Sequence, residues 1–107
     1  MIIESHALWG EEPTEEYPAT FTYLGAEPLP DKPNGRRPAA IICGGGAFTH
    51  IAPHEQDPVA FAFLDHGYQA FVLNYVTSGT GDVSFPHPHA DLAKMVATVR
   101  ANADEWH

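Results

Sequence analysis

The pattern of apolar and polar positions opens with a short alternation. Over residues 19–24, Phe21 and Tyr23 alternate with threonines, and this spacing predicts a half-buried strand. The segment before it, residues 1–18, is rich in glutamate and contains two prolines. It is expected to form an irregular, solvated lead-in. The four prolines and the Asn-Gly pair within residues 25–38 predict a turn-rich, hairpin-like return.

Two largely apolar runs predict two further strands. They cover residues 39–43 and residues 69–75, and neither shows the alternation of a strand with one solvated face. Such runs are typical of central parallel strands that are covered on both faces.

Helical spacing follows each of these runs. After the first, Asp57 is expected to be the N-cap of a helix that begins at Pro58, and Gly67 is a fitting C-terminal stop. After the second, residues 88–103 repeat apolar positions about one turn apart. In the first helix, the positions about one turn apart are Val59 and Phe63, and Ala62 and His66; the apolar stripe of the second helix is Leu92, Val96, Val99 and Ala103.

The order of these elements predicts an α/β fold. Residues 39–107 form a strand–helix–strand–helix unit, which implies a mostly parallel sheet with flanking helices and right-handed crossovers. The last helix should lead into another parallel strand, and none follows before His107. Residues 1–107 are therefore interpreted as the N-terminal portion of one larger α/β domain that lacks its C-terminal half.

Net charge and cysteine usage restrict the partners and the compartment. The formal net charge is −9, which argues against nucleic acid or an anionic membrane surface as partner, since both attract basic patches. No apolar run approaches the roughly 18 residues of a membrane span, and residues 1–6 lack a signal-peptide pattern. Cys43 is the single cysteine and cannot form an internal disulfide, so a cytoplasmic location is expected.

Three consecutive glycines follow the strand predicted over residues 39–43. Gly44, Gly45 and Gly46 leave a bare backbone whose N–H groups can point at a negatively charged oxygen. The alternative is a simple strand exit that needs glycine only for its geometry. A dinucleotide phosphate loop is disfavoured, because the last glycine of G-x-G-x-x-G is missing and no helix opens directly after the turn.

The seven histidines raise the alternative of a metal site. His50 and His54 are four residues apart, and His87 and His89 flank a proline. No carboxylate or thiol completes a recognisable ligand spacing, so neither a metal nor another cofactor is expected. Cys43 ends an apolar run and is expected to be an inert core thiol.

Taken in order, five segments resemble the α/β-hydrolase fold esterase and lipase-like family, in particular its small, acetyl-esterase-like bacterial members. They are Ile-Ile-Cys-Gly-Gly-Gly-Ala-Phe at residues 41–48, the helix from Asp57, Gly-Tyr-Gln-Ala-Phe-Val-Leu-Asn-Tyr at residues 67–75, Pro-His-Pro-His-Ala-Asp-Leu at residues 86–92, and residues 103–107. The last segment is similar to the one that leads into the family's nucleophile strand.

This resemblance implies the hydrolysis of small acyl or acetyl esters, with the glycine turn as an HGGG-type oxyanion hole. The backbone N–H groups of Gly45 and Gly46 would then stabilise the oxyanion of the tetrahedral intermediate. Cys43 stands where the family's motif has His or Pro. The residues of the supporting loop are Cys43, Gly44, Ala47 and Phe48.

The nucleophile of this family is not found in the sequence. Its G-x-S-x-G motif is absent around Ser5, Ser78 and Ser84, so no member of the triad is assigned. We expect these residues to supply the oxyanion-hole loop without being catalytically complete alone. Two explanations of the missing triad fit the sequence. Either a second chain carries Ser, Asp and His, or these residues form a truncated, non-catalytic domain. The alternative function is an interaction module that forms a homo-oligomer through an exposed sheet edge.

Overall fold

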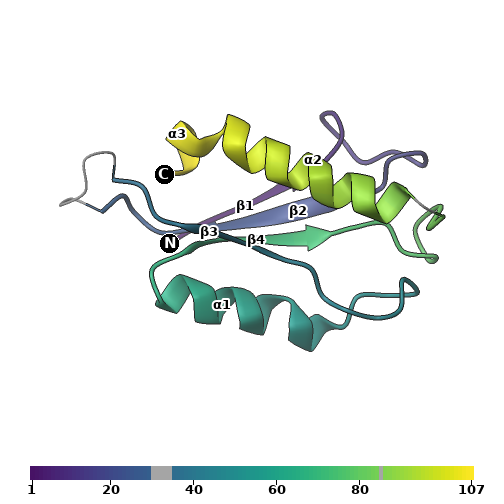
Figure 1. The fold of residues 1–107 in the computed structure, drawn as a ribbon, viewed down its shortest axis with the longest axis horizontal. Helices are drawn as coiled ribbons and strands as arrows, with labels where there is room; N and C mark the ends of the chain where they lie inside the picture. Colours follow the sequence, from purple (N-terminus) through teal and green to yellow (C-terminus); the bar gives the residue numbers. More distant parts are fainter. Residues whose placement is uncertain (30–34, 85) are drawn as a thin grey trace.

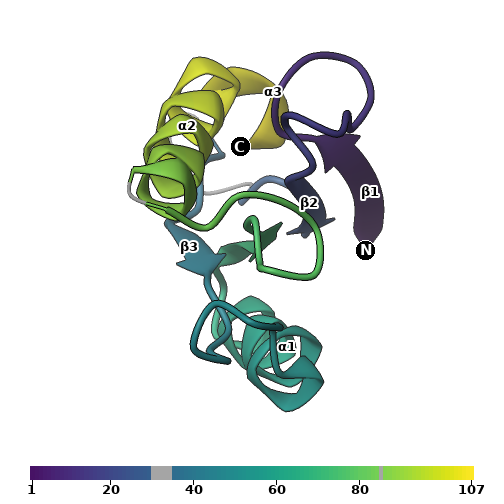
Figure 2. The same ribbon diagram turned by 90° about the vertical axis from the view of Figure 1, so that its right-hand side faces the viewer.

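A four-stranded sheet with helices on both faces forms the structure. The computed structural model of the chain describes residues 1–29, 35–84 and 86–107. Helices α2 and α3 cover one face of the sheet, and α1 covers the other (Figure 1, Figure 2). The strands are β1 (Ile2–Ala7), β2 (Thr20–Gly25), β3 (Ala39–Ile42) and β4 (Gln69–Asn74); the helices are α1 (Asp57–Asp65), α2 (His87–Ala101), α3 (Ala103–Trp106) and the short 3₁₀ helix η1 (Pro53–Glu55).

Strand β4 lies inside the sheet, which confirms the α/β fold class and corrects one connection. The strand order is β1-β2-β4-β3; β4 is antiparallel to β2 and parallel to β3, so the sheet is mixed. The chain reverses direction between β2 and β3, as predicted for residues 25–38, but β4 separates the two strands, so they do not pair as a hairpin. Asn34 of its Asn-Gly pair lies outside the described residues. The inner position suits β4, since an apolar strand buries most surface when it has neighbours on both edges.

Strand β3 also departs from its prediction. It is parallel to β4, as expected, with Ala39 opposite Gln69 and Ile42 opposite Val72. It lies at the end of the sheet, however, and Ile42 is its one buried residue. No other described segment pairs with its outer edge, so the expectation of a central strand is wrong for the described part of the chain.

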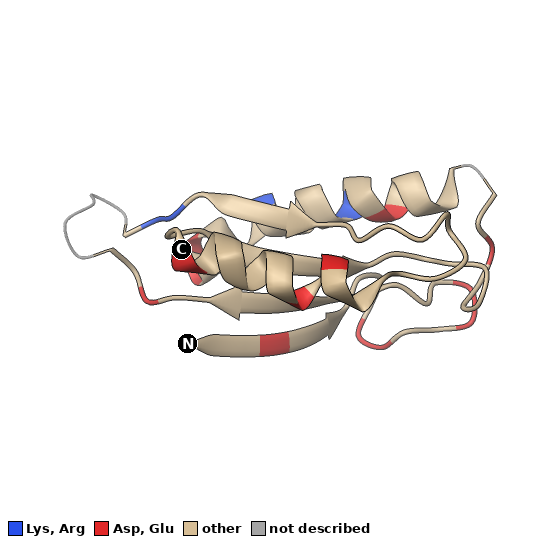
Figure 3. Cartoon of the chain, turned by 90° about the horizontal axis from the view of Figure 1, so that it is seen from below, with Lys and Arg blue, Asp and Glu red and all other residues tan. Residues whose placement is uncertain are grey.

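Strand β1 was not anticipated from the sequence. Residues 1–18 were expected to be irregular, but Ile2–Ala7 pairs antiparallel with β2 along its whole length. Its side chains are exposed or half-buried, so the apolar alternation that identifies a strand is missing. Backbone hydrogen bonding to β2 forms this strand. Acidic residues lie on β1 and on the loop that follows it, whereas the described Lys and Arg residues lie before β3 and on α2 (Figure 3).

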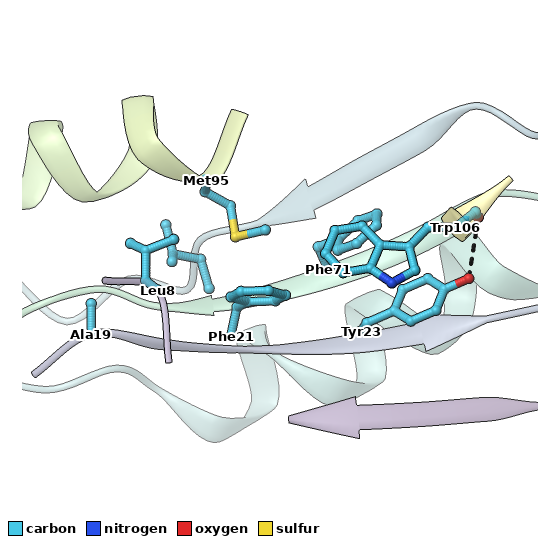
Figure 4. Close-up of a cluster of buried hydrophobic side chains, with 8 residues drawn as sticks. Leu8, Ala19, Phe21, Tyr23, Phe71, Met95 and Trp106 are labelled. Carbon is cyan, nitrogen blue, oxygen red and sulfur yellow. Dashed lines mark hydrogen bonds between the residues drawn. The ribbon is translucent and has the colours of Figure 1, made fainter. Parts of the chain in front are cut away.

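The main core lies between the sheet and helices α2 and α3 (Figure 4). The predicted inward positions Phe21 and Tyr23 are both buried, and the Tyr23 hydroxyl donates to the Trp106 carbonyl over 3.2 Å. Stacked and edge-on aromatic rings stabilise this cluster beyond the area that they bury. The buried members are Leu8, Ala19, Phe21, Tyr23, Phe71, Leu73, Met95 and Trp106.

Helix α2 presents a different face to the sheet from the one predicted. Its buried residues are Pro88, Asp91 and Met95, while Leu92 is 42% exposed. The predicted stripe of Leu92, Val96, Val99 and Ala103 is therefore rotated by about one residue, with only Val99 packed against the core. The rotation arises because the carboxylate of Asp91, a residue that sequence patterns place outside, is needed inside as a hydrogen-bond acceptor.

Helix α1 lies where it was predicted, and it packs on the sheet through residues other than the spaced pairs that indicated it. Ala60 and Leu64 contact the sheet, whereas the predicted Val59 and Phe63 are about a third exposed. Asp57 is the first helical residue and not the N-cap; Gln56 takes that position without a side-chain cap hydrogen bond. In this helix, small and branched residues at the inner positions allow close approach to β3 and β4.

The C-terminal stop of α1 at Gly67 is confirmed. Gly67 has φ +91°, its N–H donates to the Leu64 carbonyl, and the Tyr68 N–H donates to the Phe63 carbonyl. This pair of bonds is the Schellman arrangement, which requires a left-handed residue.

Replacing Gly67 with alanine is expected to lower the free energy of unfolding by about 1 kcal/mol, because a Cβ disfavours positive φ. A Cβ at this position would meet no atom closer than 3.7 Å, so the cost is conformational and not steric. Urea unfolding followed by circular dichroism measures the change. Gly79→Ala, in a loop without positive φ, is the matched control; an equal change in both variants would contradict the assignment.

Candidate functional site

The glycine turn lies at the C-terminal end of β3, beside the end of β4. Each of its carbonyls is occupied. The Tyr75 hydroxyl donates to the Gly44 carbonyl, the Ala52 N–H donates to the Gly45 carbonyl over 2.8 Å, and Thr49 donates to the Gly46 carbonyl through both its N–H and its hydroxyl. Because the N–H of a trans peptide points away from its carbonyl, the N–H after each of these carbonyls points away from the donor that holds it.

The two predicted oxyanion donors differ in their surroundings. The Gly45 N–H donates to Oε2 of Glu55 over 3.2 Å. The Gly46 N–H has no hydrogen-bond partner among the described residues. A Cβ at Gly46 would lie 2.0 Å from the His50 carbonyl oxygen, so this position admits only glycine in the present backbone. Ala47 and Phe48 continue the turn with φ of +54° and +62°.

An apolar cavity of about 210 Å³ lies next to the turn. Phe48 and Tyr75 meet edge to face across part of it, with ring centroids 6.2 Å apart. From the sequence, Phe48 is a residue of the supporting loop, Leu92 belongs to a helix stripe, and Tyr75 has no predicted role at the site. The sequence signal that could have identified Tyr75 as a cavity residue is its position directly after β4, the strand that ends beside the glycine turn. The lining residues are Cys43, Gly44, Phe48, Leu73, Tyr75, Pro88, His89 and Leu92.

Cys43 is not the core residue that its apolar run predicted. Its side chain is exposed and belongs to the cavity wall, because β3 ends at Ile42. Partial burial still raises the pKa of the Cys43 thiol above its ordinary value of 9.0. An exposed thiol with a raised pKa holds little thiolate at neutral pH.

Alkylation of Cys43 by iodoacetamide at pH 7 is therefore expected to be slower in the folded chain than in the same chain unfolded in urea. The rate in the folded chain should keep rising with pH beyond the range in which an ordinary thiol has levelled off. Mass spectrometry after timed quenching measures both rates. A folded chain that reacts as fast as the unfolded one at pH 7 would contradict a raised pKa.

The serines and histidines do not assemble a triad in the described part of the chain. Ser84 comes nearest: its hydroxyl donates to Asp82 over 2.6 Å, while His87 Nδ1 lies 2.9 Å from the Ser84 carbonyl oxygen. The hydroxyl thus contacts the carboxylate and not the imidazole, the reverse of a nucleophile–base pair. Hydrogen bonds from the Ser84 hydroxyl and N–H lower the pKa of the Asp82 carboxyl. A carboxylate with a lowered pKa is a weaker base.

Ser5 and Ser78 also make no nucleophile–base pair with a histidine among the described residues. Ser5 lies on β1, and the Ser78 N–H donates to the Phe48 carbonyl over 2.7 Å. His50 Nδ1 lies 2.9 Å from the Thr49 hydroxyl. Within the described ranges, no three His, Cys, Asp or Glu side chains gather as metal ligands would. None of the described helices has the length and apolar character to cross a membrane.

Comparisons with known proteins identify the fold of the chain. MGS-M1, an α/β hydrolase enzyme from a Medee basin deep-sea metagenome library, matches 100% of the chain with a TM-score of 0.85 and 26% identity. A candidate carboxylesterase of Lactobacillus plantarum matches 100% of it with a TM-score of 0.80 and 31% identity. Endo-1,4-β-xylanase B of Butyrivibrio fibrisolvens is 29% identical over 90 residues, which are 83% of the chain. The sequence matches no protein-family model.

The chain covers only part of each of these proteins. It spans 42% of MGS-M1, 38% of the Lactobacillus protein and 13% of the xylanase. The chain has the α/β-hydrolase fold of esterases and carboxylesterases, and it corresponds to the N-terminal portion of that fold.

Proposed function

We propose that these residues supply the oxyanion-hole loop of a carboxylic-ester hydrolase whose Ser, Asp and His come from residues outside these 107. The observation that carries the proposal is the unpaired Gly46 N–H on a glycine turn that borders an apolar cavity. A nucleophile placed beside the outer edge of β3 would bring the acyl carbon of an ester between itself and this N–H.

The chemistry of the turn fits ester hydrolysis. Attack on an ester carbonyl moves a negative charge onto its oxygen, and a preorganised N–H stabilises that charge most in a site shielded from water. The cavity of about 210 Å³ accommodates a small acyl group, and Phe48, Tyr75 and Leu92 give it an apolar wall. This mechanism needs no metal or organic cofactor.

Acetylated sugars are the substrate class that we favour among small esters. The support is the match to a xylan-degrading relative, together with the size of the cavity. A carbohydrate leaving group would extend into solvent, since the cavity is open beyond Phe48, which is 45% exposed.

A chimeric esterase tests the proposal. In it, the corresponding N-terminal 38% of the Lactobacillus protein is replaced by these 107 residues. We expect the chimera to hydrolyse p-nitrophenyl acetate with saturation kinetics, and the 107 residues alone to show none. A folded, monomeric chimera without turnover, beside an active parent, would reject the proposal.

The second candidate function is an interaction module. It is favoured by the outer edge of β3, which pairs with no other described segment and so offers unpaired backbone groups. Size-exclusion chromatography with light scattering separates the two. A stable homo-oligomer of the 107 residues supports the module, and a monomer that gains activity in the chimera supports the hydrolase.

A further inference from the structure

One peptide group of the glycine turn is held at both of its polar ends. Its carbonyl, from Gly44, accepts a hydrogen bond from the Tyr75 hydroxyl. Its N–H, from Gly45, donates to Oε2 of Glu55 over 3.2 Å. The two side chains come from different elements: Tyr75 directly follows β4, and Glu55 ends η1. A group bound from two sides cannot rotate without breaking one of the two contacts.

The neighbouring Gly45–Gly46 peptide shares the Gly45 Cα with this one and has a hydrogen bond of its own. The Gly45 carbonyl accepts from the Ala52 N–H over 2.8 Å. In a trans peptide the carbonyl and the N–H point in opposite directions, so the Gly46 N–H is turned away from Ala52. Of the two predicted donors, Gly45 and Gly46, only the Gly46 N–H is without a partner among the described residues.

We propose that Glu55 and Tyr75 are positioning residues that hold the Gly44–Gly45 peptide, and that Gly46 alone of the two predicted glycines donates to the ester oxyanion. The second part rests on the proposed function; the first does not. A carboxylate already bound to the Gly45 N–H leaves that group unavailable to a second anion, because like charges repel at such a short distance.

Two further observations agree with this clamp, by which we mean the hydrogen bonds that Glu55 and Tyr75 make with the Gly44–Gly45 peptide. Burial, and then the nearby Cys43 and Glu55, raise the pKa of the Tyr75 hydroxyl, so that it stays protonated and able to donate. A Cβ at Gly45 would lie 3.3 Å from Oε2 of Glu55, a tight approach that any side chain would have to relieve by moving the carboxylate. Glycine at this position therefore allows the carboxylate to reach the N–H.

Amide hydrogen exchange, measured by NMR in the 107-residue chain and in the chimera, tests the clamp directly. After correction for intrinsic rates, Gly45 should exchange more slowly than Gly46. Glu55→Ala should speed Gly45 exchange roughly three- to tenfold, while Glu55→Gln, which keeps an acceptor oxygen, should retain most of the protection. Tyr75→Phe should also speed Gly45 exchange, although Tyr75 does not touch that N–H.

Glu12→Ala and Tyr68→Phe are the matched controls, since neither side chain contacts the turn. The clamp is overturned if Tyr75→Phe leaves Gly45 exchange at its wild-type rate, or if Gly45 and Gly46 exchange alike in the wild type. Circular dichroism of each variant separates a local loss of protection from unfolding.

Kinetics in the chimera separate the clamp from the proposed function. Glu55→Ala and Tyr75→Phe should lower kcat roughly ten- to a hundredfold at unchanged KM, with partial recovery in Glu55→Gln. If the Glu55 and Tyr75 variants alter Gly45 exchange while kcat stays unchanged in them and in Gly46→Val, the clamp is upheld and the hydrolase role is rejected. A loss of kcat in Gly46→Val alone, with the clamp variants unchanged in exchange and rate, would reject the positioning role and keep the hydrolase.

Discussion

Gly46→Val in the chimeric esterase is expected to lower kcat for p-nitrophenyl acetate by about a hundred- to a thousandfold, the usual effect of losing one oxyanion donor. The added Cβ would meet the His50 carbonyl oxygen at 2.0 Å, so the turn must move and carry the Gly46 N–H with it. The N–H bonds the oxyanion only as negative charge develops, and KM should therefore change little.

Gly79→Ala is the control for this variant, because its Cβ meets only distant atoms, the nearest at 3.9 Å. Steady-state kinetics over a range of ester concentrations give kcat and KM separately. Activity in Gly46→Val that equals that of Gly79→Ala would show that the turn serves strand geometry alone, the alternative reading of the three glycines.

Asp91→Ala is expected to lower the free energy of unfolding by about 2–5 kcal/mol. Asp91 is buried on α2, accepts from Trp9 Nε1 over 2.8 Å and accepts from the Val76 N–H over 2.9 Å. Alanine would leave the buried Val76 N–H and the partly buried Trp9 N–H without their acceptor, and each unpaired buried donor costs about 1–3 kcal/mol.

Asp91 joins three parts of the chain that are far apart in sequence. Trp9 belongs to the loop after β1, and Val76 follows β4. The Lys94 ammonium lies over the Trp9 ring, 5.5 Å from the ring centroid. Urea unfolding followed by tryptophan fluorescence measures the loss. Asp65→Ala, at the exposed end of α1, is the control and should change stability by less than about 0.5 kcal/mol. Equal midpoints for the two variants would contradict the assigned role of Asp91.

Local chemistry in the sequence was enough to predict most elements. Strands β2, β3 and β4 lie where the alternation and the two apolar runs predict them, and α1 stops before Gly67 because only glycine adopts its backbone conformation cheaply. The place of the glycine turn, directly after β3, is likewise a local property. These features depend on residues within a few positions of one another.

The tertiary structure decided which faces are buried and what holds the site. β1 has no apolar alternation and forms through backbone pairing with β2, and β4 enters between β2 and β3. Asp91 displaces Leu92 from the core because its acceptors serve donors about 15 and 80 residues away.

The same distinction applies to the candidate site. The sequence by itself determined that three glycines follow a strand and that their backbone can approach an anion. Only the folded chain brings Glu55 and Tyr75 to the two ends of one peptide and leaves the Gly46 N–H unpaired. The physical reason is that a hydrogen bond depends on distance and direction between its two partners, and for groups from separate elements both are set by packing.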